Sequence, residues 1–374
     1  MRILHVGSRS QFVDFLVGYF EQAAPGQNTV VRLPSSAGTP GIRSKLVAVL
    51  TYARLLASVV GRARAADVVV AHMLTLPSAL AIVAARRSTY TVWSGWGVDY
   101  YGDGTESGYH LYGEQTARLS RELGLTRGPR GGRPVRLLTQ WLVDKAARRA
   151  DAFSAPIPDD FAVMTERFPG FAGTYHQLNY ADMSSFATSS DVPVGADILL
   201  GNSARAANNH LEAFEWLSAF ELVGRKVFTP LAYGDATYRE AVVARGRQLL
   251  GEAFDPLLAP MPFEDYQQRA RECVVLVMNH KRQQGLGNVG IGLYSGAHVY
   301  LARDNPLFSF LTRAGLDVVD IDSADSLPRT PVSGVALVRR RELMELIWAE
   351  DVVLANVQRL LAIAEASDPR ARVS

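Results

Sequence analysis

The sequence predicts an α/β fold in which a doubly wound parallel sheet occurs twice. A length of 374 residues exceeds what one hydrophobic core usually organises, so two domains are expected. Short apolar runs alternate with longer helical segments through both halves of the chain, which is the pattern of strand–helix units. The runs are nearly all apolar, as expected for parallel strands covered by helices on both faces. We therefore expect two Rossmann-like domains that face each other across a cleft.

Eight apolar runs are expected to form the strands. They are residues 2–6, 67–71, 89–93 and 152–155 in the first half, and residues 197–200, 226–229, 273–278 and 299–302 in the second. Between the halves, the small and polar segment 184–193 ends in proline and has the composition of an exposed connector. The expected domains are residues 1–188 and 189–345.

Two other segments stand apart from this pattern. Residues 341–366 have the spacing of one long amphipathic helix with a break near Glu350 and Asp351, and we expect a C-terminal helix over 346–374 to pack back on the first domain. Residues 102–136 form a long, Gly- and Arg-rich excursion, and a loop of that length is usually functional or mobile.

Composition narrows the class of protein. The single cysteine, Cys273, excludes an internal disulfide and a multi-cysteine metal site, which fits a reducing compartment. The first residues lack the pattern of a signal peptide, and no apolar stretch reaches the length of about 20 residues that spans a bilayer, so we expect a cytoplasmic protein. The net charge is only +2, but residues 1–185 are basic and the remainder is mildly acidic, which can mark an anionic partner on one side.

The most informative motif is segment 279–292, which follows an apolar run. It carries Lys281 and Arg282 and then turns through Gly285 and Gly287 into a helix of small residues. Such a turn lets phosphate oxygens approach backbone N–H groups, and the helix N-terminus adds about half a positive charge. A glycine-rich turn with solvated charges is the plainer interpretation. The segment is neither a Walker A loop nor a GxGxxG dinucleotide fingerprint.

Two further clusters could contact a ligand. Asn202, Ser203 and Asn208 follow the first strand of the second half, where they could bind a ligand or simply cap a helix. Trp96, Asp99 and nearby aromatic residues follow a strand of the first half. Aromatic faces beside an acid are typical of sugar sites, and Asp99 could act as a general base; the alternative is that the aromatics are core and Asp99 is a helix cap.

These clusters, in this order, carry a family resemblance. The stretches concerned are residues 96–101, 198–203 with Asn208 and His210, Pro230 with Tyr233, residues 282–287, and residues 305–306. Together they resemble the bacterial TDP-N-acetylfucosamine:lipid II N-acetylfucosaminyltransferases, the glycosyltransferase family 56 type known from enterobacterial common antigen synthesis. The helix after the glycine turn is more glycine-rich here than in the family, and residues 102–136 have no counterpart that aligns.

The resemblance implies a GT-B fold and transfer without a metal cofactor. It implies a nucleotide diphospho-sugar, dTDP-linked, held by the second domain, and a lipid-linked glycan acceptor met by the first. The donor-site candidates are Asn202, Ser203, Asn208, Tyr233, Lys281, Gln283, Gln284, Gly285, Gly287, Asn288, Asp304 and Asn305. Arg282 and Asp99 are the catalytic candidates, and Ser10, Trp96 and Tyr100 are the candidates for contact with the acceptor.

We also expect peripheral contact with an anionic membrane at the inner face of the cytoplasmic membrane. The expected surfaces are segment 42–64, whose alternative is a core helix, and the basic residues Arg127, Arg130, Arg133, Arg136, Lys145, Arg148 and Arg149. Two competing hypotheses remain open. One is a module that binds a nucleotide sugar without chemistry, and the weaker one is a nucleic-acid-binding protein, since the basic residues lack the framing of RNA-binding or helix-turn-helix motifs.

Overall fold

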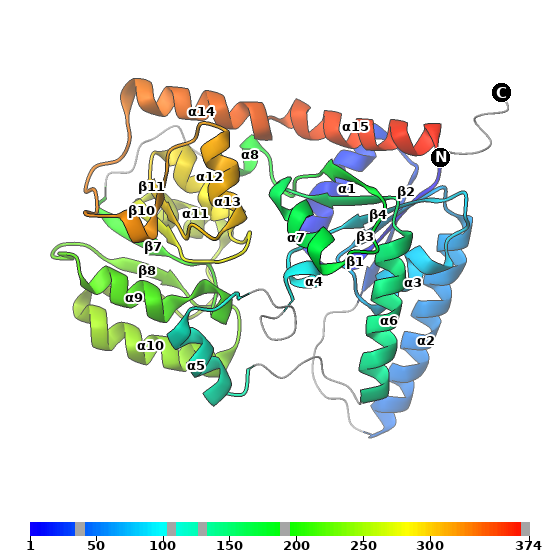
Figure 1. The fold of residues 1–374 in the computed structure, drawn as a ribbon, viewed down its shortest axis with the longest axis horizontal. Coiled ribbons are helices and arrows are strands. Elements are labelled where there is room, and N and C mark those ends of the chain that lie inside the picture. The colour runs from blue at the N-terminus through cyan, green and yellow to red at the C-terminus, as the bar shows by residue number, and fades with distance from the viewer. Residues whose placement is uncertain (34–41, 103–109, 126–132, 188–194, 368–374) are drawn as a thin grey trace. The chain divides into compact units, whose positions relative to one another are not determined.

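The computed structural model describes residues 1–33, 42–102, 110–125, 133–187 and 195–367 (Figure 1). The chain divides into two compact units. The first contains residues 1–100, 129–181 and 350–374, and the second contains residues 101–128 and 182–349. Each unit is therefore built from more than one stretch of sequence.

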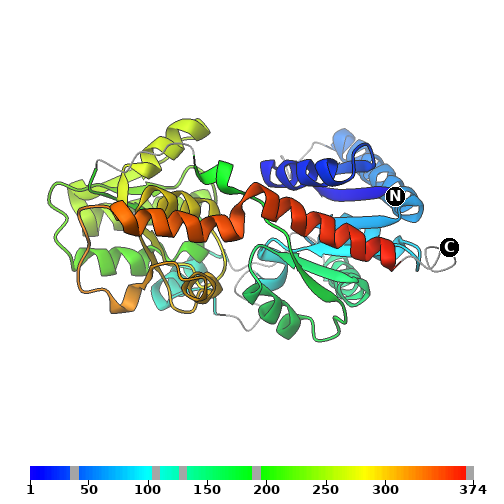
Figure 2. The ribbon, with the colours of Figure 1, turned by 90° about the horizontal axis from the view of Figure 1, so that it is seen from above.

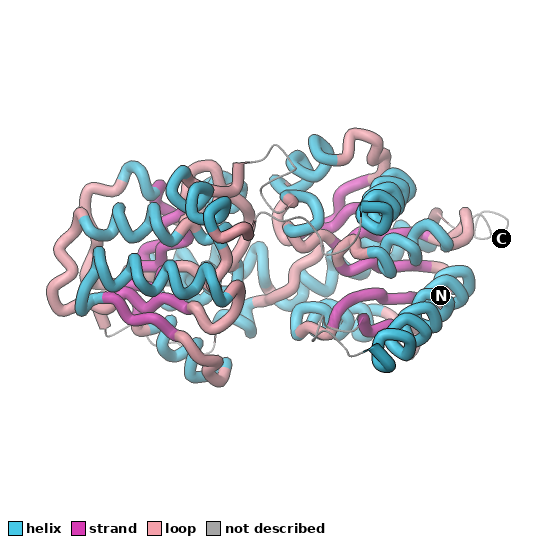
Figure 3. The backbone as a smooth tube through the Cα atoms, turned by 90° about the horizontal axis from the view of Figure 1, so that it is seen from below, coloured by secondary structure: helices cyan, strands magenta, loops and turns pink. Residues whose placement is uncertain are grey.

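The first unit contains a six-stranded parallel sheet in the order β2-β1-β3-β4-β5-β6. Its strands are β1 (Ile3–Ser8), β2 (Asn28–Leu33), β3 (Val68–His72), β4 (Tyr90–Ser94), β5 (Ala152–Ala155) and β6 (Thr174–Gln177). Its helices are α1 (Gln11–Ala23), α2 (Ile42–Ala65), α3 (Leu76–Ala84), α4 (Val98–Tyr101), α6 (Arg133–Arg149), α7 (Asp159–Arg167) and α15 (Glu350–Ala366). Helices lie on both faces of the strands (Figure 3), which explains the continuous apolar runs.

The second unit contains a six-stranded parallel sheet in the order β12-β11-β10-β7-β8-β9. Its strands are β7 (Asp197–Leu200), β8 (Val227–Pro230), β9 (Phe254–Leu257), β10 (Cys273–Met278), β11 (His298–Leu301) and β12 (Val318–Asp320). Its helices include α5 (Glu114–Glu122), α8 (Met183–Phe186), α9 (His210–Ser218), α10 (Ala236–Leu250), α11 (Phe263–Arg271), α12 (Leu286–Ser295), α13 (Pro306–Arg313) and α14 (Gly334–Trp348), with a 3-10 turn, η1, at Ala206–Asn208.

All eight expected strands are present, and the predicted α/β class with two Rossmann-like sheets is confirmed. The expected break in the C-terminal helix is also present, because α14 ends before Ala349 and α15 begins at Glu350. Helix α15 packs beside α1 in the first unit, where Val357 and Leu360 are fully buried (Figure 2).

The connector expected at 184–193 differs from the structure at its beginning. Residues 188–194, which contain the expected boundary, lie outside the described residues, but Ser184 and Ser185 belong to helix α8. Asp182 caps this helix, and Phe186 is buried against Gly290 of α12 and Trp348 of α14. A single aromatic anchor and a good N-cap therefore hold as a helix a stretch whose small polar composition indicates a linker.

Part of the 102–136 excursion belongs to the second unit. Helix α5 packs on α9, where the backbone N–H and the hydroxyl of Thr116 both donate to Glu212, over 2.9 and 2.5 Å. Residues 103–109 and 126–132 of the excursion lie outside the described residues. No helix in the described ranges is both long and apolar enough to cross a bilayer.

Candidate functional site

The strongest candidate site lies where the second sheet changes direction. Strands β7 and β10 are neighbours, with Leu200 paired to Val277, but the chain continues from them towards opposite edges of the sheet. Ligands of open α/β sheets bind at such a switch point, outside the carboxyl ends of the strands. The two loops that leave these strand ends are residues 201–203 and 279–285, which contain six of the twelve expected donor residues.

Hydrogen bonds between side chains join the two loops. Gln284 Nε2 donates to Asn202 Oδ1 over 2.9 Å, and Arg282 Nε donates to Gln284 Oε1 over 2.9 Å. Arg282 is only 7% exposed, so its guanidinium is held in a fixed place beside the turn. Gln283, between these two residues, is half-buried.

Asn208 organises the same loops from beneath. Its Oδ1 accepts the backbone N–H of Asn202 and Nε2 of His280, each over 2.9 Å, and its Nδ2 donates to the Ser203 hydroxyl over 3.3 Å. Because Asn208 is fully buried, its amide positions the loops and does not face a ligand. Sequence reasoning grouped it with the residues that touch the donor.

His280 was not singled out from the sequence. Burial, with a smaller contribution from the nearby Arg282 charge, lowers its pKa to about 3, so the imidazole is neutral at physiological pH. With Nε2 donating to Asn208, Nδ1 carries the lone pair. Only a buried strand end followed by a polar loop could have drawn attention to this residue.

Gly285 makes the turn that leads into α12. Its φ of +71° lies in the left-handed region, which favours glycine, and it stands at the N-cap without a side chain that could bond the first N–H groups of the helix. A Cβ placed on Gly287 would meet no atom within 4 Å, so the first turn of α12 is open on that side. Asn288 donates to the carbonyl of Gly201 at the limit of 3.5 Å. This turn therefore offers backbone amides and open space together.

The remaining donor candidates lie around this turn. Lys281 and Asp304 form an ion pair of 3.7 Å, in which the Lys281 side chain is partly buried and that of Asp304 is largely exposed. Asn305 is fully buried and caps α13 by accepting the N–H of Leu307 over 3.0 Å, which is a structural role. Tyr233 is 65% exposed, and its backbone carbonyl accepts the N–H of Ala204.

In the first unit, Asp99 connects the ends of β3 and β4. Its carboxylate accepts the indole N–H of Trp93 over 2.6 Å and the backbone N–H groups of Trp96 and Leu74 over 2.9 and 3.0 Å. Burial raises the pKa of Asp99 above its usual range, while these hydrogen bonds act in the opposite direction.

The three residues expected to contact the acceptor differ in exposure and in structural role. Trp96 is half-buried, and its ring lies against Phe12 and Tyr180. Tyr100 is a core residue, because it is 1% exposed and its hydroxyl donates to Asp160 over 2.8 Å. The hydroxyl of Ser10 accepts the N–H of Phe12 and caps α1.

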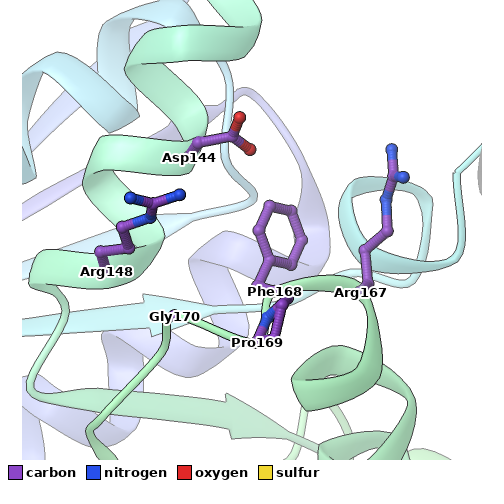
Figure 4. A pocket seen from close by; sticks show the side chains of 6 residues that line it. All are labelled: Asp144, Arg148, Arg167, Phe168, Pro169 and Gly170. Carbon is purple, nitrogen blue, oxygen red and sulfur yellow. The ribbon is translucent and has the colours of Figure 1, made fainter.

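A cavity of about 160 Å³ in the first unit lies elsewhere. Arg148, Arg167 and Phe168 line it together with Asp144, Pro169 and Gly170 (Figure 4). It lies where α6 and α7 end, before β5 and β6 begin, and hence at the amino ends of those strands. That edge is opposite to the one at which Asp99 lies.

Metal-binding groups do not gather in the described part of the chain. No group of three or more His, Cys, Asp or Glu side chains there is arranged to hold a metal ion. The buried Cys273 begins β10, and burial raises the pKa of its thiol.

Solved structures of GT-B glycosyltransferases share this two-sheet architecture. Trehalose-6-phosphate synthase OtsA has a TM-score of 0.63 and 9% identity, over 98% of this chain and 99% of that one. Sucrose-phosphate synthase from Thermosynechococcus elongatus has a TM-score of 0.60 and 11% identity, over 98% and 100%. Anabaena HepE in complex with UDP and glucose has a TM-score of 0.54 and 13% identity, over 98% and 95%. At these identities the likeness shows the fold.

The fold is that of a GT-B glycosyltransferase, and the sequence match agrees with it. Residues 177–339 match the family described as 4-alpha-L-fucosyltransferase, glycosyl transferase group 56. The match confirms the family resemblance over these residues, and together with the fold it supports a glycosyltransferase. It includes both loops at the switch point of the second sheet.

Proposed function

We propose that the chain transfers an N-acetylfucosamine-like deoxy or amino sugar from a dTDP-linked donor to a lipid-linked saccharide, without a metal ion. One observation carries the donor half of this proposal. The open first turn of α12, from Gly285 to Asn288, begins at the switch point of a parallel sheet and has the buried Arg282 beside it. The sugar and the acceptor come from the family resemblance.

The donor diphosphate is bound at this turn. The first N–H groups of a helix have no partner within the helix, and their dipoles favour an anion. The first turn of α12 contains no acidic side chain that would repel one. As the bond to the sugar breaks, negative charge grows on the diphosphate, and Arg282 with these amides stabilises it in place of a metal. Lys281, at the edge of this turn, adds a second positive charge near the diphosphate.

The rest of the donor is bound by residues around the turn. Asn202 and Ser203 are held by Gln284 and Asn208 at the end of β7. Tyr233 offers an exposed ring, and Asp304 can accept ribose hydroxyls once Lys281 turns to the diphosphate. Asn305 acts only through the start of α13.

Asp99 takes the proton from the acceptor hydroxyl. Its raised pKa makes it a stronger base than an exposed carboxylate, and its three hydrogen bonds fix its orientation. Trp96 supplies an aromatic face on which the sugar of the acceptor can stack.

The lipid-linked acceptor brings the protein to the inner face of the cytoplasmic membrane as a peripheral protein. Arg136, Lys145 and Arg148 of α6 are exposed and can face anionic headgroups. Arg149 is not, because its guanidinium donates to the carbonyls of Ile82, Ala85 and Arg86. Arg127 and Arg130 lie outside the described residues, as do the side chains of Arg133 and residues 42–48.

Donor turnover by an Arg282→Ala variant tests the proposal. We expect kcat to fall by about 100-fold, the scale for losing one stabilising group of a developing anion. Arg245→Ala is the matched control, since Arg245 pairs with Glu215 on the far helices α10 and α9. Turnover within a few-fold of wild type would show that Arg282 does not stabilise the leaving group, and loss of turnover in EDTA would contradict transfer without a metal.

The base of the nucleotide is tested separately. HepE, the similar structure, is in complex with UDP, so a thermal-shift panel should compare dTDP, UDP, GDP and ADP. Binding to the folded state raises the melting temperature by mass action. We expect the largest shift with dTDP, and a shift confined to UDP would replace dTDP as the donor nucleotide.

A further inference from the structure

The N-terminal half of α6 carries large apolar side chains that no described residue of the first unit covers. Leu137, Leu138 and Trp141 are 60%, 57% and 55% exposed. At 3.6 residues per turn they lie within an arc of about 100° around the helix axis. We call these three residues the α6 ridge. Apolar clusters on the surface of a soluble protein usually mark a contact with a partner or a membrane.

Cations continue the same face of the helix. Lys145 and Arg148 follow Trp141 by four and seven residues and are exposed, and Lys145 Nζ lies 4.9 Å from the centre of the Trp141 ring. The only acid of α6 is Asp144, which accepts a hydrogen bond from Gln140. The face is therefore apolar at one end and mainly positive at the other. Interfacial helices combine such apolar and basic faces, and tryptophan is enriched where they meet the membrane surface.

The spacing of the two ends fits a membrane surface. Leu138 and Lys145 are seven residues apart, which is about 10 Å along a helix. Interfacial helices bury their apolar face by about 5–10 Å below the headgroups. A helix that lies with this face towards the bilayer would thus place the leucines among acyl chains and Lys145 among phosphates. Arg136 is exposed on the other side of the helix, from which its long side chain can reach the headgroups.

Helix α2 repeats the arrangement beside it. Val49 and Leu50 are exposed, and Tyr52 is partly so, in a helix that packs on α3 as α6 does. Both helices extend past the short α3 (Figure 1). Helices of a doubly wound sheet run antiparallel to its strands, so these N-terminal halves lie at the carboxyl edge of the sheet. This is the edge at which Asp99 and Trp96 lie.

We propose that the α6 ridge inserts into an anionic lipid bilayer, with Lys145 and Arg148 at the level of the headgroup phosphates. This deepens the membrane contact proposed above and rests on it. The cations next to the ridge, Lys145 and Arg148, favour an anionic membrane over a second copy of the chain, because two such faces brought together would oppose like charges. Insertion would hold the acceptor edge of the sheet at the surface that carries a lipid-linked saccharide.

Vesicle flotation tests the ridge directly. The full-length protein is mixed with vesicles of phosphatidylcholine alone or with phosphatidylglycerol. We expect binding only to the anionic vesicles, and a fall of roughly tenfold or more in partitioning for Leu137→Ser/Leu138→Ser, which removes two apolar side chains that the bilayer would bury. Lys145→Glu should weaken binding and reduce its salt dependence. Leu346→Ser is the matched control, since Leu346 is 74% exposed on α14 of the second unit, and it should bind as wild type does.

A second readout reports insertion itself. The difference in emission between wild type and Trp141→Phe isolates Trp141, which should shift to the blue when anionic vesicles are added. An unshifted Trp141, equal flotation of wild type and the double variant, or a dimer in solution that the double variant loses would each overturn the proposal.

The same variants separate this inference from the proposed reaction. Transfer to a water-soluble acceptor, and the dTDP thermal shift, should be unchanged in Leu137→Ser/Leu138→Ser. Wild-type flotation without any transfer would refute the proposed reaction and still support the ridge.

Discussion

Asn209 and Asn279 exchange two hydrogen bonds between side chain and backbone. Asn209 Nδ2 donates to the carbonyl of Asn279 over 2.9 Å, and Asn279 Nδ2 donates to the carbonyl of Asn209 over 3.3 Å. Asn209 also donates to Leu111 and accepts the N–H of Gly113. One buried amide therefore joins the start of loop 279–285, the start of α9 and the segment that leads into α5.

Asn209→Gly should loosen the start of loop 279–285, which we call the donor loop. Asn209 has a φ of +50°, which glycine adopts without strain, so the variant removes the amide and spares the backbone. We expect about 3 kcal/mol loss of unfolding free energy, from three side-chain hydrogen bonds of about 1 kcal/mol each, and a several-fold rise in donor KM with kcat little changed. Urea unfolding and donor titration measure the two effects. Gly224→Ala, in an open turn of the same unit with φ +71°, is a control for backbone strain alone. An unchanged KM would show that the donor loop does not depend on Asn209.

Gly287→Ala should separate donor binding from folding. A methyl group there meets no protein atom within 4 Å, and alanine in a helix stabilises by roughly 0.5–1 kcal/mol relative to glycine. If the diphosphate lies on the first turn of α12, the same methyl group obstructs it, and donor affinity should fall at least tenfold while the melting temperature holds or rises. A variant that binds donor as wild type does would place the diphosphate elsewhere. Gly290→Ala is a contrasting case, because its Cβ would lie 2.5 Å from the Phe186 ring and should destabilise the fold.

Asp99→Asn distinguishes a base from a structural carboxylate. The amide keeps the shape but cannot take a proton, so a general base predicts a fall in kcat of about 10²–10⁴-fold. Burial raises the pKa of Asp99, so the acid limb of the kcat profile should lie above the usual range of aspartate and vanish in the variant. An unaltered pH profile combined with lower thermal stability would show that Asp99 only fixes the loop between Leu74 and Trp96.

Acid should destabilise the first unit through a buried histidine pair. His5 Nδ1 and His72 Nε2 are 3.2 Å apart, and burial lowers the pKa of His5 to about 4 and that of His72 well below its usual value. Both are neutral when folded and protonate more readily when unfolded, so their stability contribution is lost as pH falls from 6.5 towards 4. For His5 this is about 2 kcal/mol between pH 7.5 and 5. Chemical unfolding at both pH values should show a smaller difference for His5→Asn than for wild type, and an equal difference would contradict the assignment.

The strands that the sequence did not predict are the four edge strands, β2, β6, β9 and β12. A central strand is buried on both faces and appears as an apolar run, whereas an edge strand is short, partly exposed and tolerant of polar residues. Strand β6 consists of Thr174 to Gln177, and β9 contains Pro256, which a central strand would exclude. Hydropathy alone therefore identifies the interior of each sheet and misses its borders.

The location of the candidate site was predictable from the sequence, but the roles of several of its residues were not. Arg282 and the glycine turn follow a recognisable strand, and their residue types suggest phosphate binding. The roles of Asn208, Asn305 and Tyr100 were not predictable from residue type. The sequence does not distinguish an amide or phenol that faces a ligand from one that is buried in a hydrogen-bonded core. Only burial distinguishes them.

The second unit depends on a stretch of chain that is made long before the rest of it. Residues 101–128 are separated from residues 182–349 by the segment that contains β5 and β6 of the first sheet. Tyr112, Leu119 and Leu125 of the earlier stretch pack on the second core. The first unit in turn waits for α15, the last helix. During synthesis neither unit can complete its fold until the ribosome has passed residue 349. A recombinant fragment that begins at residue 182 would expose to solvent the apolar surface that α5 covers, and it should aggregate.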